Sequence, residues 1–355
     1  MKKLFLSIAV LILTISCSGN KESKSNTFEL ALVTDVGTID DRSFNQGSWE
    51  GLKQYADENN ITYKYYKPTQ KTTDAYIDAI DLAIVAGAKL VVAPGYLFEP
   101  AIYKAQDANP DTKIILLDAI PRDDATGEIK IGNNVYSIFY AEEEAGFLAG
   151  YSIVKEGYTN LGFMGGIAVP AVIRFGYGFV QGASYAAKEL NIDNVKVDYT
   201  YLGSFGPSPD IQTKANAWYK NGVQAIFTPA GGAGNSVMAA AEQNNTWVIG
   251  VDVDQSGEST SVITSAMKMI AKSVYDGITD FYNGTFKGGQ SVVLDAKVNG
   301  VGLPMESSKF KNFTEEDYKN IYSKLVDGSI KLLKDTDAKS VSELPINNIK
   351  INELQ

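Results

Sequence analysis

The sequence contains no histidine among its 355 residues and only one cysteine. Without histidine, the chain cannot build a Ser-His-Asp or Cys-His catalytic site, a histidine-ligated zinc site or the commonest general base of enzymes. A single cysteine cannot form an intramolecular disulfide bond. These two shortages exclude more classes of protein than any motif that is present.

Basic residues are also scarce. The chain has 32 Lys and Arg residues against 42 Asp and Glu, a net charge of −10. The first sixteen residues contain two lysines and no acid, so the remainder carries 30 basic and 42 acidic residues, a net charge of −12. Nucleic-acid binding requires a basic surface, so nucleic acid is not an expected partner. The acidic residues are scattered, which favours solubility over a specific site.

The N-terminal segment differs from the rest of the chain. Lys2 and Lys3 precede the apolar run Leu4–Ile15, which is too short for a comfortable membrane span, and we interpret residues 1–16 as a signal peptide. Cys17 lies at the expected cleavage point, in an arrangement that resembles a bacterial lipobox, although Thr14 and Ile15 depart from the usual residues.

The resemblance implies that Cys17 is lipidated and that residues 17–27, which are polar and rich in Lys and Ser, form a flexible tether. The protein would then be held at the extracytoplasmic face of a bacterial cell membrane by its lipid. The alternative is an ordinary secretory signal followed by a free cysteine.

From Leu30 the chain alternates apolar strands with amphipathic helices, which predicts an α/β fold with a parallel sheet covered by helices on both faces. A long helix is expected at Ala141–Lys155, and a similar second series follows it. This repetition and the length of 355 residues predict two doubly wound domains. Expected strands of the first series are Glu29–Thr34, Thr62–Tyr66, Leu90–Pro94, Lys113–Asp118 and Glu128–Asn133; its helices are Phe44–Asn59, Thr72–Ala86 and Phe98–Asn109.

The second series is expected to contain strands Asn160–Gly165, Val195–Tyr201, Ala225–Pro229 and Trp247–Val253, with helices Val172–Leu190, Pro209–Asn221 and Gly234–Asn244. The pattern then changes. We expect an extended segment at Val262–Ser265, a helix at Met267–Asn283, strands at Val292–Ala296 and Gly300–Leu303, and helices at Glu315–Asp327 and Leu332–Ala338. The tail from Ser340 is weakly patterned.

The stretch Leu30–Trp49 suggests a ligand site. A buried strand is followed at once by polar residues and then by a helix that begins near Phe44. In open α/β sheets, ligands bind beyond the carboxyl ends of the strands. Asp35 is therefore placed to accept hydrogen bonds and Phe44 to offer a ring face. The alternative is an ordinary connection with a helix-capping Asp and a core Phe.

Two other patterns do not predict sites. Asp252 and Asp254 could form a metal site together with Asp35, but the residues around them lack the spacing of a calcium-binding loop, so we expect no metal site. The glycines of Gly162–Gly166 match neither a dinucleotide fingerprint nor a phosphate-binding loop with its lysine. We interpret them as a tight strand exit that faces the cleft.

Several motifs together resemble the basic membrane protein family of bacterial lipoproteins, most closely its purine nucleoside receptor group, which serves ABC transporters as substrate-binding proteins. They extend in family order from Leu30 to about Phe286. They are VTDVGTIDDRSFNQGSWEGL (Val33–Leu52), APGYLFEPA (Ala93–Ala101), IGNNVYSIFYAEEEAGFLAG (Ile131–Gly150), GFMGG (Gly162–Gly166), GYGFVQGA (Gly176–Ala183), GSF (Gly203–Phe205), TPAGGAGN (Thr228–Asn235), VIGVDVDQS (Val248–Ser256) and TSAMK (Thr264–Lys268).

The resemblance implies a type I periplasmic-binding-protein fold, with two α/β lobes, three crossovers between them and one ligand in the cleft. Residues 28–137 and 265–288 are then expected in lobe 1, and residues 138–264 and 289–355 in lobe 2. The helix expected at Met267–Asn283 returns to the first lobe, and the strands after Gly289 return to the second.

The resemblance also implies roles for site residues. In the family, two phenylalanines sandwich the purine base, and Phe44 and Phe205 stand in the matching motifs. Stacking of a base on an aromatic ring contributes about 1–3 kcal/mol. Asn45 and Asp118 suit the base edge, since an amide offers donors and an acceptor and a carboxylate offers acceptors. The remaining candidates suit the ribose: Asp35 and Asp252 as acceptors, Lys268 as a donor, and Gly231 or Gly232 for close backbone approach. Phe44 and Lys268 are expected on lobe 1, Phe205 and Asp252 on lobe 2.

The function implied is capture of a purine nucleoside such as inosine, guanosine or adenosine, followed by delivery to an ABC permease, without a cofactor and without catalysis. Three alternatives remain open at this point. The chain could be an enzyme such as a nucleoside hydrolase or phosphorylase, a surface protein that recognises a host macromolecule or a sensor kinase, or the same fold binding a sugar or another small solute.

Overall fold

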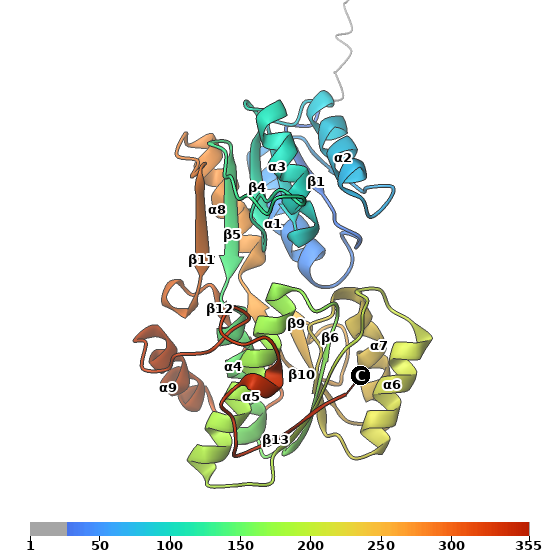
Figure 1. Ribbon diagram of the computed structural model, residues 1–355, viewed down its shortest axis with the longest axis vertical. Helices are drawn as coiled ribbons and strands as arrows, with labels where there is room; N and C mark the ends of the chain where they lie inside the picture. The colour runs from blue at the N-terminus through green and yellow to red at the C-terminus, as the bar shows by residue number, and fades with distance from the viewer. Residues whose placement is uncertain (1–26, 355) are drawn as a thin grey trace, which may run out of the picture.

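Strand β1 (Leu30–Val33) is buried on both faces, as its uninterrupted apolar sequence requires in a parallel sheet. Leu30 and Leu32 pack with residues of α1 (Phe44–Asn59), whereas Ala31 and Val33 pack with residues of α2 (Thr73–Val85) and α3 (Glu99–Ala108). The computed structural model describes residues 27–354, and Figure 1 shows them as two lobes, each built around one sheet.

The first lobe has a six-stranded parallel sheet in the order β11-β5-β4-β3-β1-β2. Helices α2 and α3 cover one face, and α1 and α8 (Ile270–Tyr282) cover the other. The remaining strands of this sheet are β2 (Tyr63–Tyr66), β3 (Leu90–Pro94), β4 (Lys113–Leu117), β5 (Val135–Tyr140) and β11 (Gln290–Leu294).

The second lobe has a seven-stranded sheet in the order β12-β10-β9-β8-β6-β7-β13, parallel except for β12. Its strands are β6 (Asn160–Gly165), β7 (Lys196–Tyr201), β8 (Ala225–Phe227), β9 (Trp247–Asp252), β10 (Val262–Lys268), β12 (Val301–Gly302) and β13 (Lys350–Glu353). Its helices are α4 (Glu142–Lys155), α5 (Pro170–Leu190), α6 (Pro209–Lys220), α7 (Gly234–Asn244) and α9 (Glu315–Val326).

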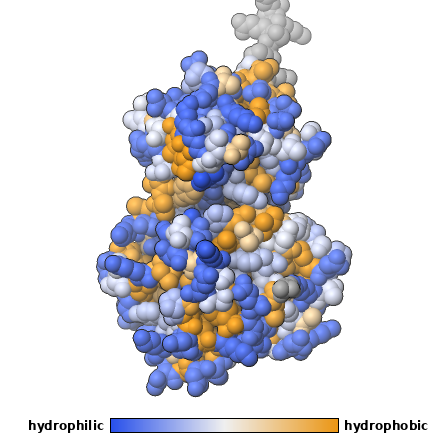
Figure 2. Space-filling view, in the orientation of Figure 1, coloured by the Kyte–Doolittle hydropathy of each residue, from blue (hydrophilic) through white to orange (hydrophobic). Residues whose placement is uncertain are grey.

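Three crossovers join the lobes, in agreement with the fold that the motifs implied. The chain passes from β5 to α4, from β10 to α8, and from β11 to β12. The molecule is narrower between the two lobes, where the chain crosses, than at either lobe (Figure 2). Within residues 27–354, no helix combines the length and the apolarity that a membrane crossing requires. The predicted signal peptide, Cys17 and most of the tether lie outside the described residues.

The expected strand Glu128–Asn133 is wrong. This segment is mostly exposed and makes only an isolated bridge between Arg122 and Ile129, so it has no buried face for a sheet to cover. The fifth strand is β5 instead, whose side chains are almost all buried and which pairs with β4.

Two lobe assignments are also wrong. Lys268 ends strand β10, which pairs with β9 in the second sheet, so it belongs to the second lobe and not to a helix of the first. Helix α8 begins only at Ile270, because pairing of Lys268 with Val301 of β12 keeps the preceding residues extended. Strand β11 pairs with β5 in the first sheet, so the chain after Gly289 does not return directly to the second lobe.

The C-terminal region differs from expectation in two places. The segment Leu332–Ala338 is not a helix, and its backbone forms turns and irregular structure. The weakly patterned tail supplies β13, which pairs in parallel with β7 as an edge strand of the second sheet. An edge strand needs little apolar sequence, because only part of its surface is covered.

Helices α4 and α5 approach each other closely at four glycines. Gly146 and Gly150 of α4 lie against backbone carbonyls of α5, and Gly178 and Gly182 of α5 lie against those of α4. A Cβ atom at any of these positions would overlap with the facing carbonyl group. The spacing of four residues on each helix places both glycines on one face, so the contact is fixed by sequence.

We therefore expect Gly150→Ala to lower the free energy of unfolding by about 1–3 kcal/mol, the usual cost of overpacking. Chemical denaturation monitored by circular dichroism measures this effect. Gly257→Ala is the matched control, because nothing lies within 4 Å of a Cβ at Gly257. Equal stability of the two variants would contradict the close approach.

Candidate functional site

A cavity of about 340 Å³ lies between the lobes, where the strands of both sheets end. Its volume falls within the range of roughly 300–1,000 Å³ that is usual for small-molecule sites. All nine predicted binding residues contribute to its lining: Asp35, Phe44, Asn45, Asp118, Phe205, Gly231, Gly232, Asp252 and Lys268. The structure thus brings these residues together, and their binding of a ligand remains a prediction.

The fold explains why residues far apart in sequence meet here. Each site residue follows a strand or ends one. Asp35 follows β1, Phe44 and Asn45 begin α1, and Asp118 follows β4. On the second lobe, Phe205 follows β7, the two glycines belong to a short 3-10 turn after β8, Asp252 ends β9 and Lys268 ends β10.

Lys268 is the centre of the charged part of the site. Its Nζ lies 2.6 Å from Asp118 Oδ2, 3.2 Å from Asp252 Oδ1 and 3.7 Å from Glu142 Oε1. Burial alone would lower the pKa of Lys268, but the three carboxylates outweigh this effect and raise it, so the ammonium stays charged. Nζ also lies 4.3 Å from the centre of the Phe44 ring, a cation–π distance.

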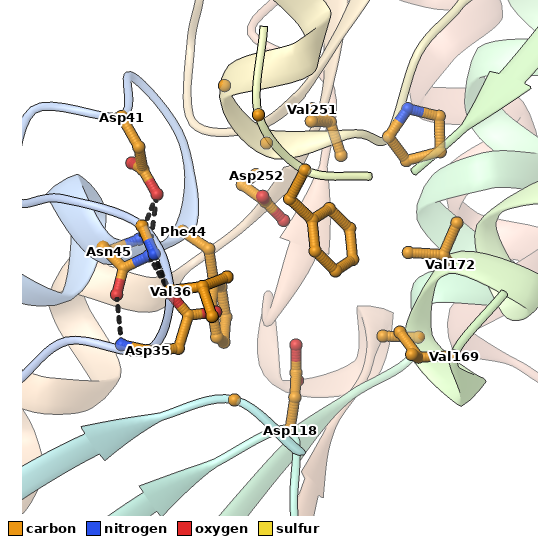
Figure 3. A pocket seen from close by; sticks show the side chains of 18 of the residues that line it. Asp35, Val36, Asp41, Phe44, Asn45, Asp118, Val169, Val172, Val251 and Asp252 are labelled. Carbon is orange, nitrogen blue, oxygen red and sulfur yellow. Dashed lines mark hydrogen bonds between the residues drawn. The ribbon is translucent and has the colours of Figure 1, made fainter. Parts of the chain in front are cut away.

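The backbone at Asp118 and Asp252 is unusual. Both residues have positive φ, 53° and 66°, a left-handed conformation that L-residues adopt at an energetic cost. Each lies at the carboxyl end of a strand, and each contacts Lys268 through its carboxylate. Strained backbone of this kind is common at ligand sites. One oxygen of Asp118 has no hydrogen-bond partner among the described residues, and Figure 3 shows this side chain pointing into the cavity.

The loop after β1 is held by an amide and two carboxylates. Asn45 Nδ2 donates to Asp35 Oδ1 at 2.9 Å and to Asp41 Oδ2 at 2.8 Å, the bonds drawn in Figure 3. The Asp35 carboxylate also accepts from the backbone N–H of Gly37 at 2.7 Å. Burial raises the pKa of both Asp35 and Asp41, although these hydrogen bonds act in the opposite direction. Both amide hydrogens of Asn45 are thus used within the protein.

Apolar side chains form the rest of the cavity wall. Phe44 and Val36 contribute from the first lobe, and Val169, Val172 and Val251 face them from the second (Figure 3). Phe205 completes this wall from a loop of the second lobe. Gly166 lies beneath its ring, where a Cβ atom would overlap with the ring carbons. The strand exit Gly162–Gly166 therefore supports the cleft, as expected, through the space that Gly166 leaves.

Contacts between the lobes lie beside the cavity. Ser43 Oγ of the first lobe donates to Asp252 Oδ2 of the second at 2.5 Å. Gln255 Nε2 donates to the Arg42 carbonyl at 2.6 Å, and the Arg42 guanidinium lies 2.7 Å from Glu258. Because Asp252 also contacts Lys268, the lobe contacts and the site share one carboxylate.

Sequence reasoning missed the role of Glu142. This residue starts α4 directly after the first crossover and is fully buried. Its carboxylate lies between Lys268 and Arg174, whose guanidinium is 3.5 Å away and also pairs with Asp335. Burial first, and then Asp118, raise the pKa of Glu142 well above its ordinary value. Acidic residues in the first turn of a helix are usually interpreted as favourable to its dipole, so the sequence carried no signal of this burial.

Glu144, two residues further along α4, contacts the third crossover. Its carboxylate accepts from the backbone N–H of Ala296, in the segment between β11 and β12. Burial raises the pKa of Glu144 from 4.5 to about 7, against the smaller opposing effect of this hydrogen bond. The folded protein therefore holds a proton here at pH values at which the unfolded chain has released it.

This difference predicts a pH-dependent stability. Between pH 4.5 and about 7 the folded state binds more protons at Glu144 than the unfolded state, so the contribution of Glu144 to the free energy of unfolding falls as the pH rises. Glu144→Gln keeps an acceptor for Ala296 but cannot titrate. We expect the stability of the wild type relative to Glu144→Gln to decrease from pH 5 to pH 8 in denaturation experiments. A pH-independent difference would contradict the raised pKa.

Residues 28–336 match the family described as Bmp, ABC transporter substrate-binding protein PnrA-like. The ABC transporter nucleoside-binding protein BmpA of Lactococcus lactis subsp. cremoris is 32% identical over 314 residues, covering 82% of this chain and 85% of that protein. Basic membrane protein A1 of Borrelia garinii subsp. bavariensis is 29% identical over 336 residues, covering 93% and 95%.

Solved structures share the fold. An ABC transporter solute-binding protein from Aeropyrum pernix K1 superposes with a TM-score of 0.74 at 23% identity, covering 89% of this chain and 95% of that one. A second solute-binding protein, from Conexibacter woesei, gives a TM-score of 0.67 at 20% identity, covering 87% and 99%. The expected periplasmic-binding-protein fold is confirmed. The chain therefore belongs to the PnrA-like family of ABC transporter substrate-binding proteins, which bind a solute without transforming it.

Proposed function

We propose that this protein captures a purine nucleoside between its two lobes and delivers it to an ABC permease. The observation that carries the proposal is one cavity with phenylalanines on both lobes, Phe44 and Phe205, and with carboxylates beside them. A nucleoside has a flat base that needs apolar faces and a ribose whose hydroxyls need acceptors. The nucleoside-binding relative from Lactococcus lactis supports the same class of ligand.

The charges of the cavity favour an uncharged ligand. Asp35, Asp41, Asp118 and Asp252 all line it, and Lys268 is the basic residue among the lining positions. Its ammonium is already shared by Asp118 and Asp252. A phosphate group would therefore meet carboxylates without a free cation to balance it, which costs several kcal/mol when like charges are buried together. This arrangement supports a nucleoside rather than a nucleotide as the ligand.

Lobe closure supplies the mechanism. A ligand that contacts both lobes stabilises the closed form by its differential affinity for that form, and hinge closure of this kind is common in periplasmic binding proteins. Phe44 and Asp118 act from the first lobe, and Phe205, Asp252 and Lys268 act from the second. The ribose hydroxyls donate to Asp252 and Asp35, and Asp118 accepts from the polar edge of the base. No bond in the ligand is made or broken.

The protein works at the extracytoplasmic face of the membrane. Substrate-binding proteins of this family act outside the cytoplasm, and a relative bears the name basic membrane protein. Lipidation of Cys17 after removal of residues 1–16 would hold the binding protein close to its permease. Mass spectrometry of the protein purified from membranes tests this anchor by the mass of a diacylglyceryl group on Cys17.

Calorimetric titration after removal of carried ligand tests the proposed specificity. We expect tight binding of inosine, guanosine or adenosine and no measurable binding of ribose or inosine 5′-monophosphate. Phe205→Ala should weaken the binding of purine nucleosides by about 1–3 kcal/mol, the range of base–aromatic stacking. Phe310→Ala is the control, because Phe310 is also half-buried but packs on Phe313 away from the cavity.

The sugar-binding and enzyme alternatives each predict a different outcome. Absence of heat with every nucleoside would contradict the proposal and move the ligand to a sugar or another solute. Release of free hypoxanthine from inosine would indicate an enzyme. Binding of the monophosphate as tight as that of inosine would contradict the argument from charge.

Gly166 should affect ligand binding indirectly, through the position of the Phe205 ring. A Cβ at Gly166 overlaps with the ring of Phe205, which lies on a loop and can be displaced. We expect Gly166→Ala to weaken binding of inosine to the same degree as Phe205→Ala, and the double variant to add little to either single change. Titration of the three variants measures this coupling. Full additivity would contradict the support of Phe205 by Gly166.

A further inference from the structure

The cavity is rich in hydrogen-bond acceptors and poor in side-chain donors. Five carboxylates contribute to its lining: Asp35, Asp40, Asp41, Asp118 and Asp252. An ionised carboxylate only accepts hydrogen bonds. A purine nucleoside, however, carries acceptors of its own on the ring nitrogens and on the ribose oxygens. A ligand of this kind therefore needs donors that the carboxylates cannot supply.

Two of the donors in the cavity wall are already used. The ammonium of Lys268 donates to Asp118 Oδ2 at 2.6 Å and also lies 3.2 Å from Asp252 Oδ1, so it is already directed at two carboxylates. Asn45 donates both of its amide hydrogens, to Asp35 and to Asp41. Thr38 and Tyr96 add hydroxyl groups, both on the first lobe. The second lobe has to supply its donors from elsewhere.

Asn235 is the remaining polar side chain on the second-lobe wall. It is the second residue of α7 and contributes to the lining of the cavity, as Gly231 and Gly232 of the preceding turn do. In the described part of the chain, residues 27–354, its side chain makes no hydrogen bond and no other polar contact. Apart from Asp252 and Lys268, the other second-lobe residues that line the cavity are apolar or glycine.

We infer that Asn235 is a specificity-determining residue that binds the ligand from the second lobe through its carboxamide, which donates to a ligand acceptor and accepts from a neighbouring ligand donor. This inference rests on the proposed function and adds to it the group that reads the ligand's acceptors. An amide fits an adjacent donor and acceptor, a pattern present both on the edge of a purine and on the hydroxyls of a ribose. It takes the role that Asn45 cannot fill while its amide holds the loop after β1.

The position of Asn235 also links recognition to closure. Asp35, Asp118 and Tyr96 act from the first lobe, whereas Asn235 acts from the second with Asp252 and Lys268. A ligand held by the first lobe meets the amide of Asn235 only when the lobes close. The hydrogen bond therefore belongs to the interactions that distinguish the closed form from the open form.

Titration of variants of the full chain with inosine tests the inference. Asn235→Ala should weaken binding about tenfold, since it removes a hydrogen bond and leaves a buried ligand group unpaired. Asn235→Asp keeps the size and the acceptor but loses the donor and adds a charge to an acidic cavity, so we expect at least the same loss. Asn244→Ala is the matched control, because Asn244 lies at the other end of α7, bonded to Asn216.

Two analogues separate the base from the sugar. If Asn235 binds the 2′-hydroxyl of the ribose, the loss caused by Asn235→Ala should disappear with 2′-deoxyinosine. If it binds the 6-oxo edge of the base, the loss should persist with 2′-deoxyinosine and disappear with purine riboside, which lacks the oxo group. Either pattern supports the inference and assigns the ligand atom, and a loss that persists with both analogues supports it with a contact to another hydroxyl or to a ring nitrogen.

Unchanged affinity of Asn235→Ala and Asn235→Asp for inosine, while the wild type binds it tightly, would overturn the inference and leave the proposed function standing. Absence of inosine binding in the wild type would overturn both. A loss that is the same in Asn244→Ala would assign the effect to the helix and not to the side chain, and it would also overturn the inference. Thermal unfolding of each variant separates such structural effects from loss of recognition.

Discussion

The buried ammonium of Lys268 holds the centre of this molecule together. It ends strand β10, directly before the crossover into α8, and its Nζ faces a carboxylate from each lobe and a third from the start of α4. A buried charge is tolerated only where partners compensate its desolvation. Asp118 and Asp252 provide most of this compensation, and Glu142 adds a third carboxyl group 3.7 Å from Nζ. The ligand cavity and two of the three crossovers therefore share one electrostatic centre.

This centre explains other features of the site. Left-handed backbone at Asp118 and Asp252 brings two strand ends toward the same ammonium, and the energetic cost of that conformation is offset by the ion pairs it permits. Glu142 extends the charged network away from the cavity to Arg174 and Asp335, which ties the C-terminal region to the first crossover. The second-lobe wall of the cavity is otherwise largely apolar, whereas Asp35, Asp40 and Asp41 add further carboxylates from the first lobe. A site of this kind, whose lysine is already paired with carboxylates, suits a polar but uncharged ligand.

The four-glycine contact between α4 and α5 gives this network a rigid base. Glu142 lies on α4 and Arg174 on α5, so the close approach of the two helices sets the distance between their charges. If the lobes close on a ligand as proposed, this close packing places the movement at the three crossovers and not between α4 and α5. Hinge motion in two-lobed proteins depends on such a contrast between rigid lobes and short connections.

Much of this organisation could be predicted from the sequence alone. Apolar runs such as Leu30–Val33 predicted strands of parallel sheets, because a strand must be covered on both faces for every residue of such a run to be buried. The absence of histidine and the family motifs determined the class of protein. Asp35 was predicted at the cleft because it follows a strand and parallel strands end at one edge, whereas Phe205 was predicted there by the family resemblance.

Only the tertiary structure decided where segments with a weak sequence pattern belong. Lys268 lies in a strand of the second lobe because β9 and β12 pair with its neighbours, and β11 joins the first sheet because β5 offers it an edge. Hydrogen bonds and burial between distant segments likewise decided that Asn45 holds its loop and that Glu142 is enclosed, since neither contact leaves a mark in local sequence.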